Sequence, residues 1–143
     1  MTLQLTVSPD FSPDHIAGWY VFNTWLQRKL GTRCHLELYD DFPSQHRAIA
    51  EDKVDLIFAN PFDASMLVRE RGFTSIAAPI GASDEALVAV AGDSAVTCVE
   101  DLKPGVRIAQ TQDPDVNLIG MILLEPADLS KASVTPVSVS SYV

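Results

Sequence analysis

The feature that most constrains the fold is the alternation of strand-like and helix-like segments over the first 80 residues. Apolar side chains recur at every second position of residues 3–7 and 33–39, and fill nearly every position of residues 54–59. Residues 13–30 and 44–53, which lie between these strands, have helical patterns. The apolar face expected for the first helix consists of Ile16, Trp19, Tyr20, Phe22, Leu26 and Leu30. Strand, helix, strand, helix, strand is the order of right-handed parallel crossovers, so this region predicts an open α/β sheet.

The chain continues with further segments of the same two kinds. The expected elements are a helix at 63–71, strands at 74–80, 85–91 and 106–109, a helix at 114–124 and a strand at 134–139. The elements after the fifth strand are too few to close a second lobe. We therefore predict a first α/β lobe with a mostly parallel sheet over residues 1–91 and an incomplete second lobe over 92–143. A chain that stops within a two-lobed protein, or one completed by another chain, would give this pattern.

An incomplete second lobe has a consequence for association. The strand expected at residues 134–139 would have an unpaired edge, and the lobe would expose apolar surface. We therefore expect a homodimer, or aggregation, through this lobe.

Charge and composition exclude several classes of protein. Hydrophobic residues make up 47% of the chain, which is enough for a core, and ten Lys and Arg against nineteen Asp and Glu give a net charge of −9. That charge repels phosphate backbones and anionic lipid headgroups, so nucleic acid and membrane surfaces are excluded as partners. Residues 1–7 alternate as a strand does, unlike a secretory signal. We expect a periplasmic protein if a signal was trimmed, and a cytoplasmic one otherwise.

The residues that commonly carry catalysis or bind metals are scattered. Cys34 and Cys98 have no CxxC spacing, and His15, His35 and His46 lack the spacing of metal ligands. Cys34 and His35 are neighbours in a predicted strand, so their side chains point to opposite faces and cannot form a nucleophile and base. We expect buried free thiols, no metal, no cofactor and no enzymatic activity.

Four segments stand in a characteristic order and spacing: VSPDFSPD at 7–14, WLQRKLG at 25–31, AIAEDKVDLIFANP at 48–61 and EDLKPG at 100–105. Together they resemble the periplasmic solute-binding proteins of the phosphate, phosphite and phosphonate transport family, which have the type II periplasmic-binding-protein fold. The resemblance implies a small-molecule ligand held in a cleft between two lobes, and an ABC permease as partner in uptake. Ligand-sensing domains of regulators and receptor kinases share the fold and are the alternative function, and enzymes of menaquinone or thiamine-precursor synthesis share it too.

Candidate ligand contacts stand where the predicted strands of the first lobe end. Ligands of open α/β sheets bind at the carboxyl ends of the strands. The residues expected there are Phe11 and Ser12 after the first strand, Phe42 after the second, and Asn60, Phe62 and Asp63 after the third. Structural roles remain open for four of them. Phe11 can be an aromatic plug of the core, and Ser12 can cap a helix rather than bind an oxyanion. Asn60 can bond its own turn, and Asp63 can be the N-terminal acid of its helix.

The second lobe offers Thr111 and Gln112 as ligand-binding donors, but it departs from the family pattern. Where the family usually presents a run of Ser and Thr, residues 110–117 read QTQDPDVN. The carboxylates of Asp113 and Asp115 would repel an anion bound there. Our hypothesis is therefore a ligand that is neutral, zwitterionic or cationic, rather than a simple phosphonate. The alternative is a pocket that has lost its transport ligand.

Overall fold

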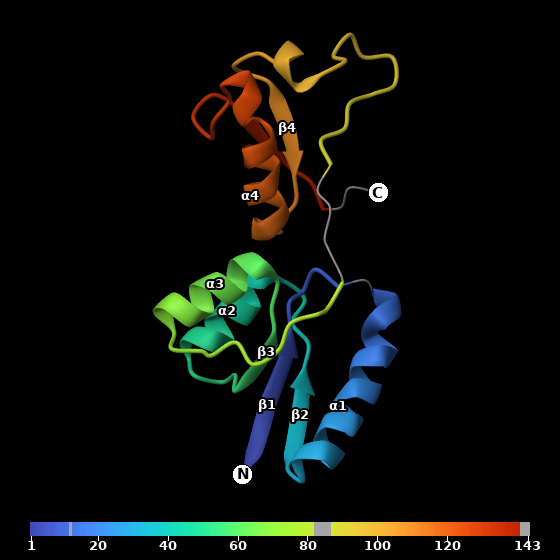
Figure 1. The fold of residues 1–143 in the computed structure, drawn as a ribbon, viewed down its shortest axis with the longest axis vertical. Coiled ribbons are helices and arrows are strands. Elements are labelled where there is room, and N and C mark those ends of the chain that lie inside the picture. The colour runs from blue at the N-terminus through green and yellow to red at the C-terminus, as the bar shows by residue number, and fades with distance from the viewer. Residues whose placement is uncertain (12, 82–86, 141–143) are drawn as a thin grey trace. The chain divides into compact units, whose positions relative to one another are not determined.

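A computed structural model describes residues 1–11, 13–81 and 87–140 of the chain (Figure 1). It divides into two compact units, Met1–Ala64 and Ser65–Val143. Each unit contains a parallel sheet with helical connections, which confirms the predicted α/β class. The lobe boundaries expected from the sequence, 1–91 and 92–143, stay a prediction.

The first unit is built on three parallel strands in the order β2-β1-β3. They are β1 (Thr2–Val7), β2 (Arg33–Glu37) and β3 (Leu56–Phe58). The connections are the short 3-10 helix η1 (Pro13–His15), helix α1 (Ile16–Leu30) and helix α2 (Phe42–Ala50), and helix α3 (Pro61–Glu70) follows β3. The two crossovers predicted from the alternation are therefore present. Figure 1 shows α1 on one side of the sheet and α2 on the other.

The two faces of strand β1 differ in chemistry. Leu5 and Val7 are buried with Leu36 under α1. The alternate residues Thr6 and Ser8, which point to the opposite face, are each 1% exposed. The side of the sheet that meets α2 is thus lined by hydroxyl groups, and these groups need hydrogen-bond partners.

Helix α1 covers the sheet with less of its surface than its sequence pattern predicts. Trp19 and Leu26 pack against the core as expected. The other residues of the predicted apolar face, Ile16, Tyr20, Phe22 and Leu30, are between 38% and 54% exposed, so that part of the prediction was wrong. The sheet is only three strands wide, so the helix contacts it along a narrow stripe and leaves its other apolar side chains exposed.

The second unit repeats the strand, helix, strand order on a smaller scale. Strands β4 (Arg107–Gln110) and β5 (Thr135–Ser138) pair in parallel, and between them lie helix α4 (Pro114–Leu123) and the 3-10 helix η3 (Glu125–Ala127). A further 3-10 helix, η2 (Val99–Asp101), precedes β4. Leu102, Met121, Leu124, Leu129 and Val134 form the core of this unit.

Two predicted strands do not form. Residues 74–80 have no regular secondary structure and are exposed, with Ile76 83% exposed. Of the strand predicted at 85–91, residues 85 and 86 lie outside the described residues, and 87–91 form no strand. An alternating pattern forms a strand only where the edge of a neighbouring strand can pair with it and a core can bury its apolar side chains. Ala77, Ala78 and Pro79 lower the strand propensity further.

The cysteines differ from each other in burial. Cys34 is buried and free, as predicted, whereas Cys98 is exposed, so the prediction for that thiol was wrong. Cys98 precedes η2, and its side chain takes part in capping that short helix instead of packing in the core. Among the described residues, no helix is long and apolar enough to cross a membrane.

Candidate functional site

The loops that follow β1 and β3 are joined by hydrogen bonds at the carboxyl edge of the three-stranded sheet. The backbone N–H of Ser8 donates to the carbonyl oxygen of Phe58 over 2.9 Å. The N–H of Asn60 donates to the Ser8 hydroxyl oxygen over 3.2 Å. The predicted position of the site, where parallel strands end, is therefore an ordered surface built from separate parts of the sequence.

Asn60 fixes the start of helix α3. Its Oδ1 accepts from the N–H of Asp63 over 2.8 Å, and its Nδ2 donates to Oδ2 of Asp10 over 3.2 Å. These contacts match the turn role that the sequence left open for Asn60. Both ends of the amide are engaged within the chain, and a ligand contact by Asn60 stays a prediction.

Asp63 is a buried acid that holds a histidine. The residue is 1% exposed, and its Oδ1 lies 3.1 Å from Nε2 of His46, whose side chain is 38% exposed. A carboxylate can only accept hydrogen bonds, so Nε2 carries the hydrogen of this contact. The pair joins the second turn of α2 to the first turn of α3 and holds the imidazole in one orientation.

Helix α2 is fixed at this edge by two polar contacts. The carboxylate of Asp41 accepts from the N–H of Ser44 over 2.7 Å. A side-chain hydrogen bond from Ser44, followed by this backbone bond, lowers the pKa of Asp41. Gln45 is fully buried, and its Nε2 donates to Thr6 Oγ1 over 3.1 Å and to the Val7 carbonyl oxygen over 2.7 Å. Because His46 directly follows Gln45, the same contacts set the position of the imidazole.

The predicted aromatic contacts have different environments. Phe42 is 7% exposed, and its ring centroid lies 6.1 Å from that of His46. Phe62, on the first turn of α3, is 38% exposed. Phe11 packs against the core cluster of Leu5, Val7 and Leu36, which is the structural role of an aromatic plug. Ser12 lies outside the described residues.

In the second unit, the start of α4 is capped by the chain itself. Oδ1 of Asp113 accepts from the N–H groups of Asp115 (2.9 Å) and Val116 (3.3 Å). Thr111 is held in the same turn, since its Oγ1 accepts from the N–H of Asp113 and its carbonyl oxygen accepts from Asn117 Nδ2. Gln112 is exposed. The donors that could bind an anion at this helix start are therefore occupied by a carboxylate.

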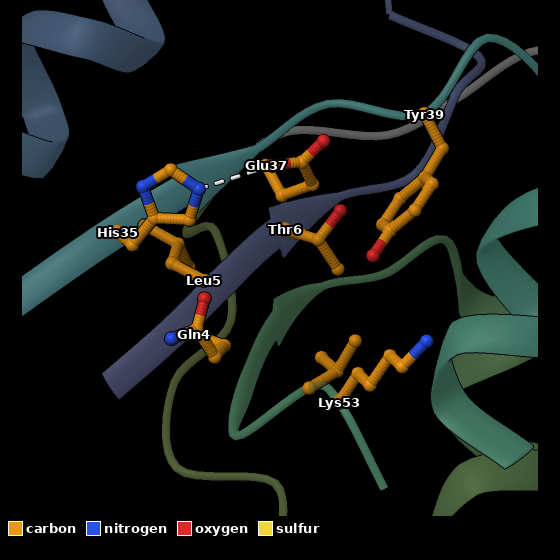
Figure 2. Close-up of a pocket in the computed structure, with 8 residues that line it drawn as sticks. Gln4, Leu5, Thr6, His35, Glu37, Tyr39 and Lys53 are labelled. Atoms are coloured by element: carbon orange, nitrogen blue, oxygen red, sulfur yellow. Dashed lines mark hydrogen bonds and ion pairs between the residues drawn. The ribbon is translucent and has the colours of Figure 1, made fainter. Parts of the chain in front are cut away.

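A cavity of about 430 Å³ lies elsewhere on the first unit, over strands β1 and β2. Figure 2 shows the side chains that line it. The charged groups in and beside it are paired, His35 Nε2 with Glu37 Oε2 at 3.0 Å and Lys53 Nζ with Glu51 Oε2 at 2.6 Å. Burial, followed by the negative charge of Glu37, raises the pKa of Tyr39, and Figure 2 shows its hydroxyl turned toward Lys53 and Thr6. None of the predicted site residues lines this cavity.

The sequence alone assigns His46 no role at the site. His46 and Asp63 are 17 positions apart and lie on different helices, so no local spacing links them. The signal was topological: helices that follow parallel strands begin at one edge, and both residues lie near such a helix start. Among the described residues, no group of three or more His, Cys, Asp or Glu side chains has the arrangement of a metal site.

Comparison with known protein families gives a match over most of the chain. The family model for the periplasmic substrate-binding protein of phosphonate ABC transporters matches residues 5–143. The match extends over both units and agrees with the resemblance read from the four sequence segments. No curated protein matches the chain.

Proposed function

Because the chain belongs to the family of periplasmic substrate-binding proteins of phosphonate ABC transporters, we propose that it captures a small solute between its two lobes and delivers it to an ABC permease. The observation that carries this proposal is the family match over residues 5–143. In this role the protein works in the periplasm and acts by binding, without catalysis. The alternative, a ligand-sensing domain with the same fold, has no feature of the described residues in its favour.

We assign the ligand contacts to the loops that follow the strands. The assigned residues are Phe11, Ser12, Phe42, Asn60, Phe62 and Asp63 in the first unit, and Thr111 and Gln112 in the second. The hydrogen bonds that join the loops at Ser8, Asn60 and Asp63 support this assignment, because preorganised loops lose less entropy when a ligand binds. Phe42 and Phe62 add apolar surface next to the polar groups.

The charge at the start of α4 bears on the class of ligand. Asp113 already accepts hydrogen bonds from two backbone N–H groups there, and Asp115 is the next acid along the helix. A second anion near these carboxylates would be repelled, whereas an amine or hydroxyl group would find acceptors. We therefore propose a neutral, zwitterionic or cationic solute.

A calorimetric and thermal-shift screen tests both parts of the proposal. The probes are inorganic phosphate, methylphosphonate, aminomethylphosphonate, ethanolamine, amino acids and polyamines. A true ligand at 100 times its Kd should add about 2.7 kcal/mol to the unfolding free energy. Tighter binding of phosphate or methylphosphonate than of any amine-bearing probe would refute the ligand class and leave the solute-binding role standing. A cooperative unfolding transition that none of the probes shifts would contradict the solute-binding role.

A further inference from the structure

We propose that His46 is a ligand contact that donates a hydrogen bond to an acidic group of the solute, and that Asp63 is the residue that positions it. This inference rests on the proposed solute-binding function and names a group of that site which the sequence does not reveal. It follows from how the His46 and Asp63 side chains are buried, bonded and surrounded.

The first step is the contrast in burial within the pair. Asp63 is almost completely buried, and His46, whose Nε2 lies 3.1 Å from Asp63 Oδ1, keeps 38% of its side chain exposed. A buried carboxylate fixes the ring and its tautomer, as in many sites that use an oriented imidazole. The exposed part of the ring is therefore the part available to a ligand.

The second step concerns the other polar groups at the same edge. Asn60 has both ends of its amide bonded within the chain, Asp41 caps α2, and Gln45 is fully buried. An acidic ligand group needs a donor, preferably a cationic one. His46 is partly exposed, oriented and able to carry a positive charge, so it fits this requirement.

The remaining charged groups at this edge set the local field. They are Asp10 after β1, Asp14 and His15 at the start of α1, Asp40 and Asp41 before α2, and Arg47 on α2. Acids outnumber bases in this set. Arg47 is exposed and is the next residue on the helix, so its side chain projects from a different face of α2 than His46 does.

The third step is proton chemistry. Since Nε2 donates to Asp63, the other ring nitrogen, Nδ1, can donate only when the ring is protonated. A neutral ring would present a lone pair to the acidic group. Histidine side chains lose their charge between about pH 5 and 8, so affinity for an acidic ligand should fall as the pH rises through that range.

The experiment is calorimetric titration of methylphosphonate and of aminomethylphosphonate into the wild-type chain and variants at pH 5.5, 6.5 and 7.5. With whichever probe binds, His46→Gln should weaken binding about tenfold or more at pH 5.5 and flatten the pH dependence, because a hydrogen bond to a charged group is lost. The matched control is His35→Gln, which removes the other carboxylate-paired histidine of the unit and should leave both unchanged.

Asp63→Asn tests positioning, because it keeps the shape of the side chain and removes the charge that holds the ring of His46. Binding at pH 5.5 should weaken in this variant, and the double variant Asp63→Asn/His46→Gln should bind no more weakly than His46→Gln alone, a result that a purely structural role would not produce. Ligand-free thermal unfolding shows which variants fold. If His46→Gln does not fold, imidazole NMR of the wild type replaces it, and the probe should shift the His46 resonances and leave those of His35 in place.

The outcomes separate the two proposals. Binding that is equally tight in His46→Gln, with the wild-type pH profile, overturns the role of His46 and leaves the solute-binding function intact. Failure of the wild type to bind either acidic probe at any of the three pH values overturns the donation to an acidic group. If amine-only probes still bind, the solute-binding function survives that failure.

Discussion

Two helix starts that follow parallel strands, those of α2 and α4, share a capping device and differ in the charge of their surroundings. Both begin after an aspartate whose carboxylate accepts from backbone N–H groups, Asp41 at α2 and Asp113 at α4, and both have a proline in the first turn. Beyond the cap, α2 carries His46, which is held by Asp63. Helix α4 instead carries another acid, Asp115, in its first turn.

At the starts of both α2 and α4, the chain's own carboxylate accepts from the backbone N–H groups that an anion would otherwise bind. The positive end of the helix dipole is offset in both places by an aspartate. What remains for a ligand is decided by the next side chains, which are a partly exposed imidazole at α2 and a further acid at α4. The same local fold therefore presents side chains of different charge at the two helix starts.

The largest expected effect tests whether the two helix starts are supported by separate cores. Leu124 is 1% exposed and packs with Met121, Leu102 and Val134. Leu124→Ala should lower the unfolding free energy by about 2–5 kcal/mol, because it removes buried contacts and leaves a cavity. Hydrogen exchange should show the loss of protection in β4, β5 and α4, with β1 and β2 retaining theirs.

The matched control for this core variant is Leu118→Ala, on the same helix at a position that is 41% exposed. It should change the unfolding free energy by less than about 1 kcal/mol. Equal loss of protection in both sheets of Leu124→Ala would mean that the units unfold as one body. The starts of α2 and α4 could then not be compared as parts of two units that unfold separately.

A smaller effect comes from changing the cap of α4 directly. Asp113→Ala should destabilise the chain by about 1 kcal/mol, the usual cost of losing an N-cap. Asp113→Ser keeps an accepting oxygen and removes the negative charge, so it should cost less. Titration with inorganic phosphate should show tighter binding to Asp113→Ser than to the wild type, because the helix start no longer carries its own anion. Unchanged phosphate affinity in the serine variant would show that the aspartate charge is not what excludes anions.

The sequence predicted the sheet of the first unit well, because its signals were strong and local. Alternation placed β1 and β2, and a nearly continuous apolar run placed β3. Gly31 ends α1 in the left-handed conformation, with φ of 61°, as a glycine after a helix predicts. The exposed residues 74–80 show the limit, since a strand pattern does not reveal whether a partner strand is available.

The candidate site was predictable in position and less so in chemistry. Parallel topology alone indicated that the loops after the strands would meet, and the bonds between Ser8, Phe58 and Asn60 agree with that prediction. The sequence could not decide between a capping role and a ligand role for Asn60, because one amide can perform either. It could not reveal the contact of His46 with Asp63, because that contact depends on the relative rotation of two helices.

The smallest expected effect compares the acid response of Asp101 in the second unit with that of Asp41 in the first. The carboxylate of Asp101 accepts from the N–H of Thr97 over 2.8 Å, and also from the Thr97 hydroxyl and the Cys98 N–H. These bonds lower its pKa from 3.8 to about 2, with the backbone bond from Thr97 as the largest cause. A folded-state pKa below the unfolded value means that the ionised group stabilises the fold above about pH 4. This stabilisation is lost as the pH falls toward 2.

Thermal unfolding of the wild type and of Asp101→Asn between pH 6 and pH 2 measures this contribution. The variant should unfold at a lower temperature at pH 6, and the difference should fall to a small part of that value by pH 2, where about half of the folded wild-type carboxyl groups are neutral. Asp41→Asn is the matched variant in the first unit, where the hydrogen bonds from Ser44 lower the pKa of Asp41. Its difference from the wild type should also shrink as the pH falls. A difference for Asp101→Asn that is as large at pH 2 as at pH 6 would assign the effect to side-chain shape rather than to charge.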